Sequence, residues 1–414
     1  MKPPVMQAAA TGAGEVSRAA PPLLYMIYFI YFFCGMTLCF EAVFLPEIKE
    51  YFKLNYQEQM YTMFAKNIPF VLAVGIGYLL RYIGYKKCLT IATTLFSAGT
   101  LLLILGLRAG QYAVVLLGFL TIGIGFNFQL VAGNPLLSAL GPAKDASSRL
   151  NLGNALGAFA QIIAPATISF IIPAAVVTVR GKLPYIEGLF LVLGTVLAGV
   201  ALTTTAMKNV DVSESFQATS AAPVTGSLWS HPRAVLGFVA IFLILGTEAG
   251  LFGFYRNYLE DPAIAGLTAP ESQRMFTVYF AVFALGRMVA SWVQKKISPA
   301  THLIYHLLGA MACLAVAVFA EGMAAAAAVT AIGFFVSILF PTLYAIAIEN
   351  MGELTGQVSG LLTMGFVGCA VLPVLQGKLA DTIGLQPSYA VGFVAYVFAV
   401  FYTMRYRGRS AAHP

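Results

Sequence analysis

Four ionisable residues lie inside long apolar stretches of this chain: Glu41, Lys66, Glu248 and Arg287. A charge in hydrocarbon costs roughly 2.5–3.5 kcal/mol or more, so such residues usually face an opposite charge, a water-filled cavity or a translocation path. The chemistry they indicate is the binding and release of a proton, an ion or a polar solute. That chemistry depends on the helices that hold the four side chains.

The composition is that of a membrane protein. The chain has 414 residues, of which 59% are hydrophobic and 10% charged, whereas soluble domains carry about 25% charged residues. Backbone groups in lipid are best satisfied within helices, and about 20 apolar residues span a bilayer. We therefore predict an all-α membrane protein with twelve transmembrane helices, at 22–46, 59–81, 87–107, 111–140, 150–175, 186–206, 233–258, 275–294, 302–320, 323–348, 355–378 and 387–405.

The net charge is +7, and the basic residues are distributed along the chain as the expected topology requires. With both termini in the cytoplasm, the inside segments carry more Lys and Arg than the outside segments, including Lys86, Lys87, Lys295 and Lys296. This is the positive-inside bias of membrane proteins. The basic balance therefore predicts cytoplasmic termini and no nucleic-acid partner.

The chain divides into two related halves. Residues 208–232 are polar and Ser-rich, as in a linker. Prolines and glycines recur at offsets of 206 to 209 residues, and on the same offset Glu41 falls close to Glu248. Two six-helix repeats joined by a cytoplasmic linker are the layout of the major facilitator fold. The predicted parts are a disordered tail (1–21), an N-terminal bundle (22–207), the linker (208–232), a C-terminal bundle (233–405) and a second tail (406–414).

Glu41 and Lys66 are predicted to form an ion pair. At 1.5 Å per residue, Glu41 lies about 8 Å and Lys66 roughly 10 Å below the outer ends of consecutive antiparallel helices. Pairing would make both buried charges tolerable. Glu41 could instead be an interfacial acid, and Lys66 could extend its ammonium outward. If the pair faces a cavity, a proton or a substrate could break it, which assigns it to coupling or gating.

Glu248 is a candidate ligand for substrate. Phe252 and Tyr255 follow it at i+4 and i+7, on the same helix face. A carboxylate accepts hydrogen bonds from sugar hydroxyls, and aromatic faces cover the C–H surfaces of a sugar ring. The alternative is a core acid bonded to a neighbouring helix.

Helices 4 and 5 carry an unusual number of amides for transmembrane segments. Neutral donors and acceptors suit a polyhydroxyl ligand, although amides also join helices. These candidates are Asn127, Gln129, Asn134, Asn151, Asn154 and Gln161.

Arg287 lies about 12 Å from the cytoplasmic end of its helix, so it can reach the interface or hold a cytoplasmic gate through a helix terminus. The five cysteines form no metal-type cluster, and His302 and His306 lack a second pair, so no metal site or cofactor is predicted. The sequence also offers no nucleophile–base pair, which argues against an enzyme.

Several stretches resemble one transporter family. FFCGMTLCFEAVFLPEIKEYFKL, YLLRYIGYKK and AGNPLLSALGPAKDASSRLNLGNALGAF in the first half, with TEAGLFGFYRNYL and GRMVASWVQKKISPA in the second, are similar to the fucose/galactose/glucose:proton symporters. The resemblance covers nearly all of the chain after residue 25. It implies the twelve-helix facilitator fold and uptake of hexoses driven by protons, or by sodium in some members.

The resemblance also marks departures at the coupling residues. At the position of the family's helix 1 acid this chain has Ala42, and at the position of the family's helix 4 acid it has Leu130. Glu41 and Gln129 lie one residue earlier, a step of about 100° around a helix. The family's helix 5 Gln falls on Asn154, and Lys66 stands where an uncharged residue is usual.

We therefore predict a monomeric sugar transporter of the bacterial cytoplasmic membrane that works by alternating access and is coupled to protons or sodium. The alternatives are an uncoupled facilitator, a transporter of an anionic sugar derivative bound through Lys66, export of an amphiphile and a sugar receptor of the same fold.

Overall fold

The computed structural model describes residues 4–140, 146–173, 176, 178–207, 230–294, 296–349, 351 and 355–407, with most side chains from residue 22 onward. The first half comprises α1 (Pro4–Phe52), α2 (Tyr56–Asn67), η1 (Ile68–Leu72), α3 (Ala73–Ile83), α4 (Tyr85–Ala109), α5 (Tyr112–Ala139), α6 (Ala146–Ile171) and α7 (Val179–Ala206). The second half begins at α9 (Pro232–Glu260) and continues through α10 (Ala269–Val293), α11 (Pro299–Phe319), α12 (Gly322–Val336), α13 (Leu339–Ile348), α14 (Thr355–Met364), η5 (Gly365–Val367), α15 (Gly368–Ile383), α16 (Leu385–Ser388) and α17 (Val391–Tyr406).

The predicted all-helical architecture is confirmed. Each predicted span corresponds to one helix or to consecutive pieces of one helix, as expected for a twelve-helix facilitator fold. Within the described residues, nine helical stretches are long and apolar enough to cross a membrane. Residues 4–21 belong to helix α1, where a disordered tail is predicted; this segment is rich in alanine, the strongest helix former. The linker prediction, 208–232, falls mostly outside the described residues.

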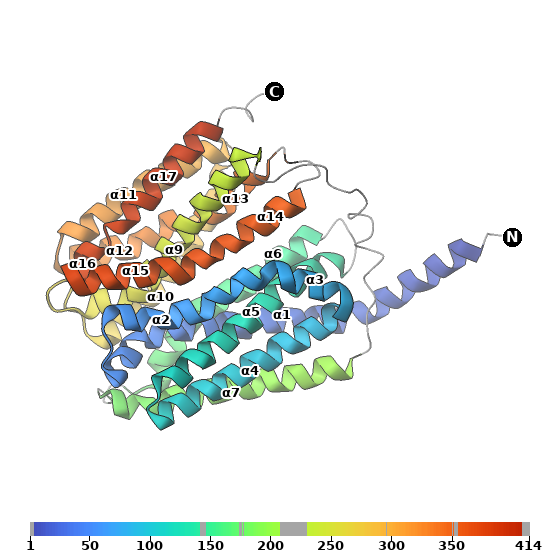
Figure 1. The fold of residues 1–414 in the computed structure, drawn as a ribbon, viewed down its shortest axis with the longest axis horizontal. Helices are drawn as coiled ribbons and strands as arrows, with labels where there is room; N and C mark the ends of the chain where they lie inside the picture. The colour runs from blue at the N-terminus through green and yellow to red at the C-terminus, as the bar shows by residue number, and fades with distance from the viewer. Residues whose placement is uncertain are drawn as a thin grey trace.

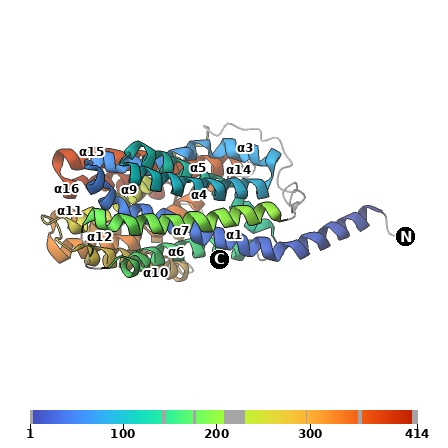
Figure 2. The same cartoon turned by 90° about the horizontal axis from the view of Figure 1, so that it is seen from below.

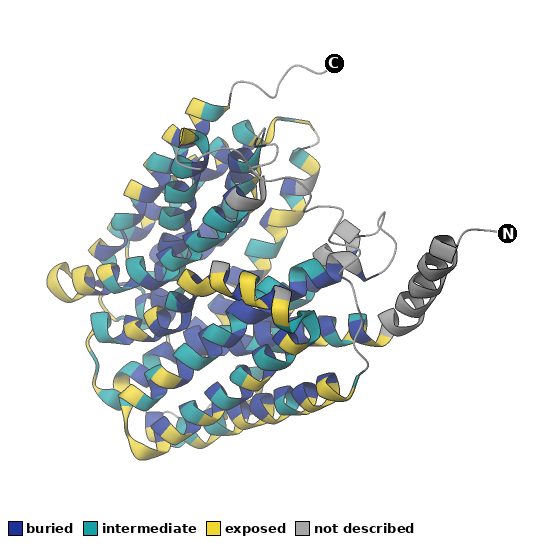
Figure 3. Cartoon of the chain, turned by 45° about the vertical axis from the view of Figure 1, so that its right-hand side comes forward, coloured by how far each residue is buried: buried dark blue, intermediate teal, exposed yellow. Residues whose placement is uncertain are grey.

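The helices run along one long axis, in two groups (Figures 1 and 2). The last residues of α7 and α17 and the first residues of α9 lie on one side of the bundle, which we call the linker side. The opposite side, where α1 ends and α2 begins, is called the distal side. Exposed residues lie around the outside of the bundle (Figure 3). They include many large apolar ones, as a bilayer requires.

Four of the predicted spans are broken, the last of them between α16 and α17 near its start. Pro69 starts the 3₁₀ segment η1 between α2 and α3, because proline cannot donate the backbone hydrogen bond that continues an α-helix. A second break separates α12 from α13, and a third, η5, separates α14 from α15. Breaks inside transmembrane helices are tolerated only where protein or a cavity covers the freed backbone groups. The breaks η1 and η5 face each other across the two halves, with Phe70 and Phe366 stacked at 5.0 Å between ring centroids.

Close helix packing in the first half depends on glycine. A Cβ at Gly35 on α1 would lie 2.4 Å from the carbonyl oxygen of Gly157 on α6, and a Cβ at Gly123 on α5 would lie 1.9 Å from that of Lys66 on α2. Only glycine fits at such contacts, so the two backbones meet directly. Gly123 thereby fixes the position of α2 at the residue that carries the buried lysine.

The two halves meet on the distal side. Asp381 on α15 accepts hydrogen bonds from the backbone amides of Tyr56 and Gln57, at 2.8 and 2.9 Å, and so caps α2 of the other half. Further inter-half hydrogen bonds join Gln59 to Asn257 and Gln273 to the carbonyl of Pro165. The inter-half hydrogen bonds named here lie on this side, and the halves also touch nearer the linker side, where α3 packs against α14 (Figure 1).

Four buried or partly buried charges complete the distal closure, and we call them the distal cluster: Glu47, Lys182, Arg256 and Glu260. Glu47 of α1 accepts from Lys182 Nζ at 3.0 Å and from Arg256 Nη1 at 2.7 Å. Arg256 of α9 also binds Glu260 of its own helix, at 2.7 Å. The cluster is electrically neutral as a whole, and each half contributes one acid and one base.

Candidate functional site

A cavity of about 230 Å³ lies between the two halves, on the linker side of the distal closure. At about 30 Å³ per molecule, this is the volume of roughly eight waters. Both halves supply its walls, as expected for a transport site at a repeat interface. The lining residues are Leu38, Met63, Lys66, Asn67, Phe126, Gln161, Leu245, Glu248, Ala249, Phe252, Tyr279, Phe280, Phe283, Phe366 and Cys369.

The predicted ion pair between Glu41 and Lys66 is confirmed. The Lys66 ammonium contacts Glu41 Oε2, and the two residues are 7% and 1% exposed. Lys66 reaches the cavity wall, whereas Glu41 lies behind it. The lysine is held from the other side by the close approach of its backbone to Gly123. The pair therefore forms a fixed, neutral unit in the wall of the first half.

Glu248 lines the cavity from the second half. Among the described residues its carboxylate makes no hydrogen bond and no ion pair, although Arg287 is close enough to interact with it electrostatically. Phe252, one turn further along α9, lies beside it and packs against Phe276 and Phe280 at 5.1 and 5.5 Å between centroids. The structure thus brings a free carboxylate and an aromatic wall together, as the spacing of Glu248 and Phe252 predicts.

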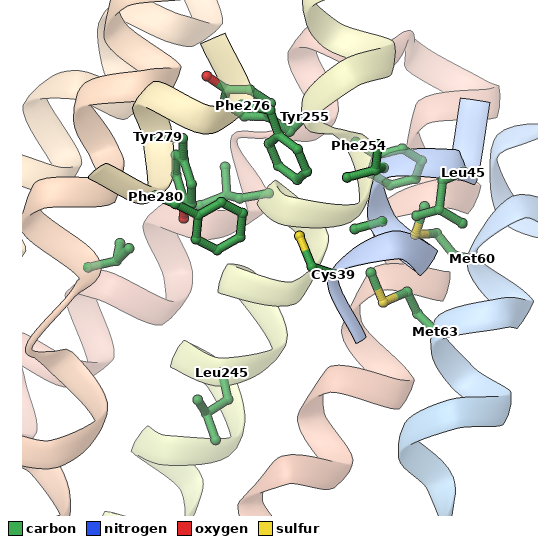
Figure 4. Packing of buried hydrophobic residues seen from close by; sticks show 14 of the residues in the cluster. Cys39, Leu45, Met60, Met63, Leu245, Phe254, Tyr255, Phe276, Tyr279 and Phe280 are labelled. Carbon is green, nitrogen blue, oxygen red and sulfur yellow. The ribbon is translucent and has the colours of Figure 1, made fainter. Parts of the chain in front are cut away.

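Tyr255 does not reach the cavity. Its hydroxyl pairs with Thr330 at 2.6 Å and donates to the carbonyl of Met275 at 3.1 Å. Its ring stacks on Phe276 in a buried aromatic group between α9 and α10 (Figure 4). Tyr255 lies on the same face of α9 as Glu248, as predicted. The cavity ends about one helical turn before Tyr255, so its side chain packs in the core.

One of the six predicted amides, Gln161 of α6, lines the cavity. Asn127 is buried and donates to the carbonyl of Pro69 at 2.6 Å, which satisfies a backbone group freed by the break in α2. Asn134 accepts from the Tyr31 hydroxyl at 2.6 Å. Gln129 is buried outside the cavity wall, and Asn154 is exposed. The side chain of Asn151 lies outside the described part of the chain.

Arg287 holds the end of a helix. Its Nε donates to the carbonyl of Ser337 at 3.1 Å, and its guanidinium lies 4.7 Å from the ring centre of Phe283. Ser337 is the C-terminal cap of α12, so the arginine binds a carbonyl that the break before α13 leaves free. This agrees with the predicted contact to a helix terminus.

Most of the cavity wall is apolar and was not singled out from the sequence. Asn67 donates to the carbonyl of Met63 at 2.9 Å, and the Cys369 thiol contacts the carbonyl of Leu245. Apolar periodicity alone does not distinguish a face toward lipid from one toward a cavity. Pro69 is the signal that could have located the break beside these residues.

The chain matches known transport proteins over most of its length. Residues 24–373 match the family described as the Major Facilitator Superfamily. A glucose/galactose transporter of Brucella abortus is 29% identical over 376 residues, which cover 90% of this chain and 91% of that protein. The L-fucose-proton symporter of Escherichia coli is 24% identical, over 93% of this chain and 92% of the other.

Solved structures show the same fold. A crystal structure of the E. coli fucose:proton symporter aligns with a TM-score of 0.66 and 20% identity, over 95% of this chain and all of the other. An inward-facing bacterial homologue of the lysosomal transporter Spinster aligns with a TM-score of 0.70 and 16% identity, over 94% and 97%. These relatives are transporters rather than enzymes. The chain is a multi-pass membrane protein that belongs to the major facilitator superfamily.

Proposed function

We propose that this protein transports a hexose or a related neutral sugar by alternating access. The observation that carries the proposal is the cavity between the halves, which combines Glu248 and the amide of Gln161 with a wall of aromatic rings. Sugar hydroxyls need hydrogen-bond partners, and the C–H faces of a sugar ring pack on aromatic surfaces. Similarity to glucose/galactose and L-fucose transporters over about nine-tenths of the chain supports the same substrate class.

The structure supports one half of an alternating-access cycle. The distal side is closed by the inter-half contacts of Asp381, Asn257 and the distal cluster. With the linker side in the cytoplasm, as the distribution of Lys and Arg indicates, this state would release sugar inward. We place the protein in the bacterial cytoplasmic membrane as a monomeric importer, driven by protons as in the fucose symporter it resembles.

Neutral sugars are favoured over anionic derivatives, because Glu41 already neutralises Lys66 at the cavity wall. The labelled sugar is whichever of glucose, galactose and L-fucose the protein exchanges. We expect these three sugars, unlabelled, to inhibit its exchange at least about tenfold better than glucuronate or galacturonate. The reason is that burying the unpaired charge of a sugar acid costs more than 1.4 kcal/mol. Exchange into proteoliposomes preloaded with sugar measures this without any ion gradient. Stronger inhibition by the acids would establish the anionic alternative.

A further inference from the structure

The two carboxylates that the internal repeat relates are held in opposite ways. Glu41 on α1 and Glu248 on α9 differ by 207 positions, the offset between the halves (248 − 41). Each has one cation within electrostatic range, Lys66 for the first and Arg287 for the second. Glu41 is closed off in an ion pair, whereas Glu248 lines the cavity and forms no ion pair with any residue that the structure describes.

The charge of Glu41 is balanced by its partner. The ammonium of Lys66 reaches Glu41 within the protein wall, and Glu41 itself is 1% exposed. A proton would have to displace a covalently tethered cation to bind there. The lysine thus takes the place that a proton would occupy on this carboxylate.

Glu248 has no such substitute. The Nε of Arg287 is occupied by the carbonyl of Ser337, and the described residues place no ion pair on Glu248. The other titratable groups that face it are Tyr279 on α10, Tyr396 on α17 and Cys369 on α15, with Lys66 across the cavity on α2. None of these is a second carboxyl group, so no carboxyl–carboxylate pair forms among them.

We propose that Glu248 carries the transported proton, while Lys66 keeps the carboxylate of the first half in an ion pair in every state. The inference rests on the proposed sugar transport. A hydronium ion on the open distal side gives a proton to a carboxylate oxygen of Glu248: one O–H bond of the ion breaks and leaves water, and an O–H bond forms on the carboxylate. After the halves rock, that bond breaks and the proton passes to water on the linker side. Closing the cavity around a charged, unpaired carboxylate costs free energy, because the charge loses its water. Protonation removes the charge and sugar fills the cavity, so the two together permit the change of state.

The test compares Glu248→Gln with the double variant Glu41→Gln/Lys66→Met, which removes the buried pair without leaving a charge. Sugar affinity of the purified protein is measured at about pH 6 and about pH 8, on either side of neutrality. In the unmodified protein and in the double variant we expect affinity to fall about tenfold as the pH rises, as one proton-linked group predicts. In Glu248→Gln, whose neutral amide stands in for the protonated acid, we expect the affinity to be independent of pH.

Glu248→Asp keeps a carboxylate and should keep the pH dependence, and Glu321→Gln, an exposed acid outside the cavity, is the matched control. The inference is overturned if Glu248→Gln retains the pH dependence of the unmodified protein. It is likewise overturned if the double variant loses that dependence, or if the unmodified protein binds sugar equally well at both pH values. Absence of sugar binding at any pH would instead refute the proposed function.

Discussion

Replacing Lys66 with methionine is expected to destabilise the protein by about 3–5 kcal/mol, because Glu41 then remains buried without its counter-charge. At about 2 °C per kcal/mol for a large domain, the apparent Tm in detergent should fall by roughly 6–10 °C. Adding Glu41→Gln removes the stranded charge and should restore most of the loss. The double-mutant cycle thereby isolates the pair from the rest of the site.

Lys378→Met is the matched control, because Lys378 is exposed and forms no ion pair among the described residues. Its apparent Tm should stay within about 1 °C of the unmodified protein, as surface substitutions usually do. If Lys66→Met melts like this control, or if Glu41→Gln does not rescue it, the ion pair contributes no stability.

Replacing Arg256 with methionine is expected to shift the protein away from the distal-closed state. Arg256 joins α9 to Glu47 of the other half at 2.7 Å, in a buried position. Without it, Glu47 keeps Lys182, but the contact across the halves is lost. Breaking a buried pair costs about 3–5 kcal/mol, so a ratio of states that favours distal closure should fall by about two orders of magnitude or more.

The distal cluster can divide between the two halves without leaving a charge unpaired. When the halves part, Glu47 stays with Lys182 and Arg256 stays with Glu260, so each half retains one acid and one base. The measurement is the rate at which a thiol reagent added from the distal side labels a cysteine placed at Ala249, in the cavity wall behind the closure, in protein whose native cysteines are replaced by alanine. Arg256→Met should raise that rate, whereas Arg274→Met, an exposed arginine on α10, should not. Equal rates in both variants would exclude the cluster from distal closure.

The sequence was sufficient for the helices because length and hydropathy alone decide what crosses a bilayer. The Glu41–Lys66 pair was also predictable, because depth along two antiparallel helices follows from counting residues. Both depend on one-dimensional distances. For Arg287, counting residues left two alternatives, and the structure shows the contact with a helix terminus.

The depth and walls of the cavity were not predictable in this way. Tyr255 shares a face with Glu248, yet it lies where α10 and the distal closure already fill the space. Asn127 is drawn to Pro69 by a helix break that periodicity does not reveal. Whether a polar face meets a cavity or a neighbouring helix depends on how twelve helices pack, and no single span carries that information.

The most direct test of sugar transport is uptake of labelled glucose, galactose and L-fucose into proteoliposomes whose interior is more alkaline than the medium. We predict that at least one of these sugars accumulates transiently above its outside concentration, and that a protonophore abolishes the accumulation. Entry of all three at the rate of protein-free vesicles, with or without the gradient, would contradict the proposal.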